Sequence, residues 1–157
     1  MITYKAIKIN RKNSPLIANL VYKTYQNFNK HEADKKSLSN YLSRFDNATN
    51  SADSLAKRFK WSNINFGAFS GKKLIGIIRG KSNRIINLFV AGDFHNQGVG
   101  ERLINLFERQ AKKEKSKLIK IRSSLYAVGF YSKMGYKKTT GVRLCKGLRE
   151  QPMKKEI

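Results

Sequence analysis

The stretch LFVAGDFHNQGVGERLINLF, residues 88–107, decides the fold of this chain. The apolar run Leu88–Val90 predicts a strand, and Val99–Phe107 repeats apolar side chains at helical spacing. Between them, Gly98 and Gly100 allow a tight turn and a close approach of the backbone to a ligand, because neither carries a Cβ atom. The following helix presents free N–H groups and its positive dipole end to this loop, which favours a phosphate or pyrophosphate. An ordinary helix-entry turn is the alternative.

Length and composition indicate one domain, residues 1–157, with 40% hydrophobic residues to build its core. Cys145 is the only cysteine, so no intramolecular disulfide forms, and we expect it to be buried in a C-terminal strand. No apolar run reaches the roughly 18 residues of a membrane span, and Met1–Lys5 lacks the apolar segment of a secretion signal. We therefore expect a cytoplasmic protein without a membrane partner.

The formal net charge is +23, from 33 basic and 10 acidic residues. Such an excess attracts polyanions, including nucleic acid and ribosomes, and favours anionic small ligands. However, the basic residues are spread along the whole chain, as compositional bias would also produce, and form no cluster interleaved with aromatic residues. A nucleic-acid partner is therefore compatible with the sequence but is not favoured.

The rest of the chain predicts helices first and strands afterwards. In order, we expect a strand over Ile2–Ile9, a helix capped by Ser14, a loop over Asn29–Lys36, a helical stretch over Leu38–Phe45 and a short helix capped by Ser51. Three strands joined by short turns then form an antiparallel meander, over Ile64–Phe69, Lys73–Arg79 and Arg84–Val90.

After the glycine loop, the pattern predicts a long helix from about Val99 to Lys115. A strand over Leu118–Arg122 lies parallel to Arg84–Val90 if this helix is a crossover. A further helix begins at Ser123 or Ser124 and ends at Gly135, and two last strands cover Tyr136–Val142 and Arg143–Arg149. The result is an α/β fold with a mixed, mostly antiparallel sheet and flanking helices.

Two motifs carry a resemblance to a known family. His95–Gly100 follows the pattern Gln/Arg-x-x-Gly-x-Gly/Ala, with histidine at the first position. Ser124–Tyr131 follows Asn-x-x-Ala-x-x-(Leu/Phe)-Tyr with serine in place of asparagine, and the pair Gly135-Tyr136 comes after it. In this order and separation, the chain resembles the GNAT superfamily of acyl-CoA-dependent N-acyltransferases over nearly its whole length.

The resemblance implies a GNAT-like sheet with a parallel, splayed strand pair, and an N-acetyltransferase that moves an acetyl group from acetyl-CoA to a primary amine by direct transfer. The backbone N–H groups of Gln97–Glu101 would hold the cofactor pyrophosphate, and the Val90 N–H would polarise the thioester carbonyl. Tyr131 would be the catalytic residue that protonates the CoA thiolate, although its simplest structural role is that of a core aromatic. The implied cofactor-binding residues are Leu88, Phe89, Val90, His95, Asn96, Gln97, Gly98, Val99, Gly100, Glu101, Ser124 and Ala127.

The general base is not identified by the sequence. Relatives often use a glutamate on the central strand, but Arg84–Val90 contains no carboxylate. The remaining candidates are Asp93, His95, Glu32 and Asp34, and none is favoured. With only two histidines and no cysteine near them, we expect no metal site.

The acceptor amine also stays open between a small amine, an antibiotic, an amino acid and a protein N-terminus or lysine. The positive charge disfavours a polycation, and favours an anionic metabolite or an acceptor on an acidic or nucleic-acid-bound partner. Tyr25, Phe28, Tyr41 and Trp61 belong either to the core or to the acceptor pocket. A catalytically silent nucleic-acid or ribosome-binding module and an acyl-CoA sensor are alternatives on the same fold. Homodimer formation through C-terminal strands, with the tail Gln151–Lys155, is compatible with the sequence.

Overall fold

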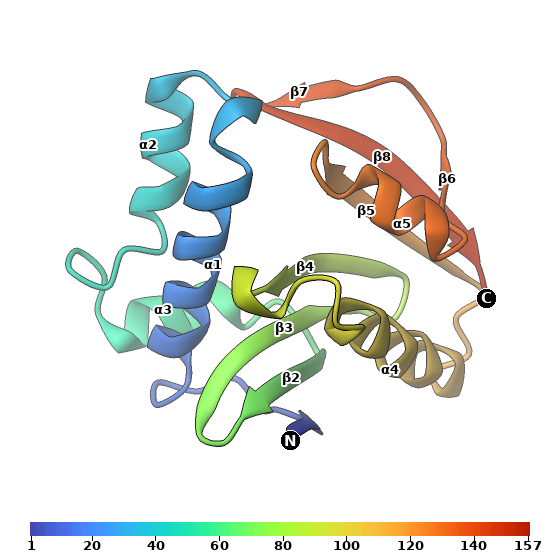
Figure 1. Ribbon diagram of the computed structural model, residues 1–157, viewed down its shortest axis with the longest axis horizontal. Coiled ribbons are helices and arrows are strands. Elements are labelled where there is room, and N and C mark those ends of the chain that lie inside the picture. Colours follow the sequence, from blue (N-terminus) through green and yellow to red (C-terminus); the bar gives the residue numbers. More distant parts are fainter.

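A computed structural model describes residues 1–157, and its centre is one eight-stranded mixed sheet (Figure 1). The strands are β1 (Ile2–Ala6), β2 (Ile64–Ser70), β3 (Lys73–Lys81), β4 (Arg84–Val90), β5 (Leu118–Ser124), β6 (Lys137–Lys138), β7 (Arg143–Cys145) and β8 (Leu148–Glu156). They follow the order β1-β2-β3-β4-β5-β8-β6, and β7 also pairs with β8. Only β4 and β5 run parallel, so the mixed, mostly antiparallel sheet predicted from the sequence is confirmed.

Helices cover both faces of this sheet. They are α1 (Ser14–Phe28), α2 (Lys35–Ser43), α3 (Ala52–Phe59), α4 (Val99–Lys113) and α5 (Val128–Lys133). Buried residues of α1 and α3 pack against Ile77 of β3, whereas α4 packs against Ile75 and Ile78 on the other face, together with Tyr131 of α5. Figure 1 shows α1, α2 and α3 grouped at one end of the molecule, away from α4 and α5. No helix has the length and apolar character to cross a membrane.

The parallel pair β4–β5 separates almost as soon as it forms. Its register holds a single pair, Arg84 with Lys120, beside the bond from Lys120 N–H to Asn83 O at 2.9 Å. By contrast, β4 is in register with β3 at six positions and β5 with β8 at seven. The two strands therefore splay, and the sheet opens in its middle, where the backbone edges of β4 and β5 lack a neighbouring strand.

Two helix starts differ in how they are capped. Ser51 caps α3 as predicted, since its side chain accepts a hydrogen bond from Ser54 N–H at 3.1 Å. The prediction for Ser14 is wrong, because Ser14 is the first helical residue and its hydroxyl donates to Asn10 O at 2.6 Å. The N-cap position belongs to Asn13, whose side chain accepts from Asn10 N–H instead of a helical N–H.

The segment Asn29–Lys36 is not entirely loop as predicted. It contains a 3-10 turn over Lys30–Glu32, and α2 already begins at Lys35. The reason is Asp34, whose carboxylate accepts from Ser37 N–H at 2.9 Å and so caps the helix.

Ser123 and Ser124 do not begin a helix, because they pair with Gln151 and Glu150 of β8 and extend β5. The helix α5 therefore starts only at Val128. It is followed by Gly135, whose φ of +89° confirms the left-handed cap predicted there.

The C-terminal strands differ from those predicted from the sequence. Instead of strands over 136–142 and 143–149, the chain forms the short β6 and β7 and then the nine-residue β8. Lys146 and Gly147, both with positive φ, make the turn between β7 and β8. The sequence did not predict β8, because the strand contains Pro152 and five charged residues, and proline and charged side chains are depleted in strands. Cys145 is half-buried on β7 and not buried as expected.

Candidate active site

The glycine loop leaves a row of backbone donors without acceptors. Gly98 adopts φ +75° and precedes α4, whose first backbone hydrogen bond runs from Arg102 N–H to Gly98 O at 2.9 Å. No acceptor in the chain binds the N–H groups of the five residues Gln97–Glu101. Such a row at the N-terminus of a 15-residue helix is suited to an anion.

The two loop glycines have different structural reasons. A Cβ atom at Gly98 would meet no other atom, so its positive φ is what requires glycine there. At Gly100, a Cβ atom would lie 3.1 Å from the Phe130 ring, so a side chain would push α4 away from α5. Gly100 therefore serves helix packing, in addition to any approach of a ligand.

His95 fixes the end of β4. Its Nε2 atom lies 2.7 Å from Val90 O, and since a carbonyl only accepts, Nε2 carries the proton. The other ring nitrogen, Nδ1, lies 3.4 Å from the Tyr126 hydroxyl, and the ring packs on Phe28 with centroids 4.6 Å apart. These contacts assign His95 a positioning role in the loop.

The backbone of Val90 faces the opening between the splayed strands. Ala91 N–H donates to Ile75 O of β3 at 2.8 Å. Because successive residues of a strand direct their N–H groups to opposite sides, the Val90 N–H points away from β3, toward the gap beside β5. The Val90 carbonyl points the same way, where His95 binds it.

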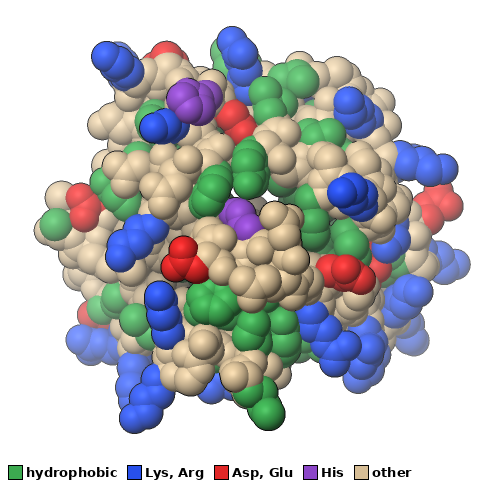
Figure 2. All heavy atoms as spheres, viewed as in Figure 1, with side chains coloured by type: hydrophobic (Ala, Val, Ile, Leu, Met, Phe, Trp, Pro, Cys, Tyr) green, Lys and Arg blue, Asp and Glu red, His purple; other side chains and the backbone are tan.

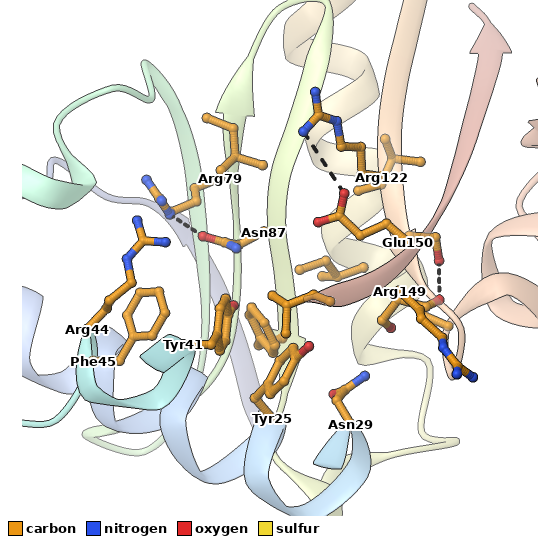
Figure 3. A pocket seen from close by; sticks show the side chains of 18 of the residues that line it. Tyr25, Asn29, Tyr41, Arg44, Phe45, Arg79, Asn87, Arg122, Arg149 and Glu150 are labelled. Carbon is orange, nitrogen blue, oxygen red and sulfur yellow. Dashed lines mark hydrogen bonds and ion pairs between the residues drawn. The ribbon is translucent and has the colours of Figure 1, made fainter. Parts of the chain in front are cut away.

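A cleft of about 380 Å³ lies between the splayed strands, β8 and the helices α1–α3 (Figure 3). Of the residues predicted for the site, the cleft is lined by Leu88, Phe89, Ser124, Ala127 and Tyr131. The others are not in its lining and lie at the end of β4, in the loop that follows and in the first turn of α4: Val90, His95, Asn96, Gln97, Gly98, Val99, Gly100 and Glu101.

Tyr131 reaches the cleft from within the core. Its ring meets those of Phe130 and Tyr136 edge-on, with centroids 5.3 Å and 5.5 Å away. The Tyr136 hydroxyl donates to Glu108 at 3.0 Å, whereas the Tyr131 hydroxyl makes no hydrogen bond within the chain. Burial raises the pKa of Tyr131 above its ordinary value, so the phenol stays protonated at neutral pH.

Three carboxylates weighed as the general base lie elsewhere. Glu32 accepts from the N–H groups of Leu125 at 3.1 Å and Tyr126 at 2.7 Å, and so connects the 3-10 turn after α1 to the loop after β5. Asp34 caps α2, and its hydrogen bonds with Ser37 lower its pKa. Asp93 is exposed outside the cleft lining.

Glu150 is the only carboxylate in the cleft lining, and it was not among the residues predicted for the site. It pairs with Ser124 across β8 and β5, and its Oε2 atom is buried 4.0 Å from Arg122 Nη1 without a hydrogen bond (Figure 3). Burial raises the pKa of Glu150, and Arg122 partly opposes this shift. No signal in the sequence distinguishes Glu150 from the other acidic residues, because β8 itself was not predicted.

Aromatic side chains form the wall opposite β8. The rings of Tyr25 and Tyr41 lie 4.2 Å apart, and burial raises the pKa of both hydroxyls. Trp61 lies at the rim with 74% of its surface exposed, and Phe28 is outside the cleft. The sequence assigned four aromatic residues either to the core or to the acceptor pocket. Three of them, Tyr25, Tyr41 and Trp61, line the cleft.

Arginine dominates the charges of the cleft. Five lining residues are arginines, namely Arg44, Arg58, Arg79, Arg122 and Arg149. Nowhere in the chain do three or more His, Cys, Asp or Glu side chains gather as a metal site would require.

The chain matches the sequence profile of a known protein family. Residues 20–157 match the sequence profile of the acetyltransferase (GNAT) domain. No curated protein sequence matches the chain.

Solved structures share the fold at low sequence identity. A GCN5-related N-acetyltransferase from Rhodopseudomonas palustris superimposes with a TM-score of 0.80 at 17% identity, covering 99% of this chain and 95% of its own. The PaiA N-acetyltransferase from Thermoplasma acidophilum, solved in complex with coenzyme A, gives 0.73 at 15% identity and covers 99% of both chains. The ribosomal-protein-S18-alanine N-acetyltransferase from Escherichia coli gives 0.58 at 16% identity, covering 98% of this chain and 91% of its own.

Proposed function

The chain belongs to the GNAT acetyltransferase family, and from this premise we propose that it transfers the acetyl group of acetyl-CoA directly to a primary amine. The observation that carries the proposal is the end of β4, where the free N–H groups of Gln97–Glu101 adjoin an unpaired strand edge. Tyr131 and Glu150 line the cleft that opens from this edge. A donor of the acetyl group and an acceptor would meet between them.

The loop and the strand would hold acetyl-CoA mainly through the backbone. The N–H groups of Gln97–Glu101 would bind the pyrophosphate, with His95 and Asn96 shaping the loop. The free edge of Leu88–Val90 would pair with the amide groups of the pantetheine arm, as an added strand does. The Val90 N–H would then donate to the thioester carbonyl oxygen, and Ser124 and Ala127 would line the thioester end.

The acceptor side would supply the base. Glu150 takes a proton from the amine nitrogen, which attacks the thioester carbonyl carbon and forms the new C–N bond. The C–S bond breaks, and Tyr131 donates its proton to the leaving thiolate. Burial raises the pKa of phenol and thiol alike, since both anions lose hydration, so the proton transfer between them stays feasible in the buried site.

The first test is titration calorimetry with acetyl-CoA. Gln97→Glu puts a negative charge among the free N–H groups and should raise the Kd about fivefold or more, from one charge repulsion at short range. Asn105→Asp makes the same charge change on an exposed position of α4, and should leave the Kd within about twofold. If the wild type does not bind acetyl-CoA, or both variants behave alike, the cofactor assignment is wrong.

The second test is CoA release with a panel of amines. Tyr131→Phe should lower kcat about tenfold or more while acetyl-CoA still binds, because only the proton donor is lost. Binding without turnover on any amine would support the acyl-CoA sensor. Salt-sensitive RNA binding without acetyl-CoA binding would support the nucleic-acid module instead.

A further inference from the structure

Arg79 is a buried cation without a counter-charge. Its side chain rises from β3 and is only 6% exposed. Nε donates to Asn87 Oδ1 at 2.7 Å, and Nη1 donates to Phe59 O at 3.0 Å and to Ser62 Oγ at 3.3 Å. All three acceptors are neutral, and Nη2 has no partner in the chain.

None of the three ion pairs of the chain includes Arg79. They join Arg11 to Asp53, Arg122 to Glu150 and Lys155 to Glu108. Burying a charge without an opposite charge is costly, and here the cost shows as a pKa of Arg79 lowered to about 10 by loss of hydration. An anion bound in the cleft would offset the lost hydration free energy of the Arg79 guanidinium.

Two more arginines surround the same part of the cleft. Arg44 follows the end of α2, and both Arg44 and Arg79 lie close enough to the Tyr41 hydroxyl to lower its pKa against the effect of burial. Arg58 of α3 also lines the cleft, and its buried Nε atom has no hydrogen-bond partner. Three arginines without an ion pair, Arg44, Arg58 and Arg79, therefore line the same cleft.

Glu150 lies on the opposite wall of the cleft from Arg44 and Arg79, whereas Arg122 and Arg149 lie on the same wall as Glu150. Figure 3 shows Arg44 and Arg79 on one side of the cleft, with Tyr41, and Glu150 with Arg122 on the other. In contrast, Figure 2 shows lysine and arginine spread over the whole visible face of the molecule, without one dominant patch. The only carboxylate of the cleft thus lies across from Arg44 and Arg79, and the cleft volume of about 380 Å³ suits a small molecule.

We infer that the acceptor is a small amine that also carries a carboxylate or a phosphate. Arg79 and Arg44 bind this anionic group, and the amine then faces Glu150 and the thioester. The planar fork of a guanidinium suits both anions, because it donates two parallel hydrogen bonds. Polyamines would place a second cation against these arginines and are poor acceptors. This inference rests on the proposed acetyl transfer and names its substrate class.

The test compares four amines of similar length at saturating acetyl-CoA. They are γ-aminobutyrate, aminopropylphosphonate, butylamine and putrescine, which differ in the group opposite the reacting amine. We expect kcat/KM for one or both anionic amines to exceed that for butylamine about tenfold or more, with putrescine the poorest, from one charge-assisted pair. The first two amines distinguish a carboxylate from a phosphate ligand.

The variant for this test is Arg44→Gln, because Arg44 is exposed and makes no contact that the fold needs. It should reduce the preference for anionic amines over butylamine about fivefold or more, mainly through KM. Arg79→Lys is the second variant, since it keeps the charge and loses the fork. The matched control is Arg109→Gln on the exposed side of α4, outside the cleft, which should keep the wild-type preference.

Failure of this inference and failure of the proposed function give different results. If butylamine or putrescine is acetylated as well as the anionic amines, the protein is an acetyltransferase and the inference is overturned. If no amine is acetylated, calorimetric titration of aminopropylphosphonate and γ-aminobutyrate into the wild type and Arg44→Gln, with CoA present, decides separately. Binding that weakens in Arg44→Gln supports the anion site, and no binding to the wild type overturns it.

Discussion

Two buried charged side chains on opposite faces of the sheet, Glu108 and Arg79, differ in whether the chain supplies an opposite charge beside them. On the α4 face, Glu108 accepts from Lys155 Nζ at 2.9 Å and 2.8 Å and from the Tyr136 hydroxyl at 3.0 Å. On the cleft face, Arg79 meets only neutral acceptors. The first charge is balanced within the chain and supports the fold. The charge of Arg79 has no such partner and, in our proposal, is balanced by an anionic ligand. The comparison therefore distinguishes a charge that stabilises the fold from one that binds substrate.

The largest expected effect comes from removing the cleft carboxylate. Glu150→Gln keeps the size of the side chain and loses the base, so kcat should fall about 100-fold or more. Because burial raises the pKa of Glu150, the wild-type kcat/KM should decline as the pH falls through this raised pKa. The variant should lack that acid limb. The measurement is the pH profile of acetyl transfer, and a variant with wild-type kcat would remove Glu150 from the mechanism.

The next effect concerns the balanced charge. Lys155→Met leaves Glu108 with one hydrogen-bond donor, and should lower the free energy of unfolding by about 2–3 kcal/mol, as loss of one partner of a buried pair does. Urea unfolding measures this change. The neighbouring Lys154→Met is the matched control, since Lys154 is exposed and unpaired, and it should stay within about 0.5 kcal/mol. Equal losses in the two variants would mean that the pair with Glu108 is not what stabilises this face.

A smaller effect is expected on the Tm when phosphate binds beside the unpaired charge of Arg79. With CoA present at saturating concentration, inorganic phosphate at about ten times its Kd should stabilise the wild type by about 1.4 kcal/mol and raise the Tm about 3–6 °C. Arg79→Met should abolish most of this rise, although it removes one of the two hydrogen-bond donors to the Phe59 carbonyl. Sodium chloride at equal ionic strength is the control for general screening. Equal shifts of the Tm by chloride and phosphate would mean that Arg79 does not form a specific anion site.

The two sides of the site also differ in how far the sequence predicts them. The cofactor side uses backbone conformation within one short segment, where Gly98, the apolar run Leu88–Val90 and the helix after it are contiguous. Local patterns report such a segment well, so the splayed strands and the loop were expected before the structure. Whether these residues bind acetyl-CoA stays a prediction.

The acceptor side is assembled from side chains of distant elements. Arg44, Arg58, Arg79 and Glu150 come from the end of α2, from α3, β3 and β8. In a chain with 33 lysines and arginines, nothing local separates these three cleft arginines from the rest. The strand that carries Glu150 was itself not predicted, because Pro152 and its charged neighbours argue against a strand, and the strand is stabilised by its pairing with β5, β6 and β7.

The smallest expected effect concerns stability, because the ionised form of Glu150 destabilises the folded chain. Because its pKa is higher in the folded than in the unfolded chain, the stability it contributes is complete below the unfolded pKa and is lost as the pH rises through the folded pKa. Glu150→Gln, which cannot ionise, should therefore match the wild type near pH 4 and have the higher Tm at pH 8. The gain should be about 2 °C or less, since water and Arg122 screen this partly exposed carboxylate. Melting curves at both pH values measure it, and a lower Tm of the variant at pH 8 would mean that Glu150 stabilises the cleft face as Glu108 stabilises the other.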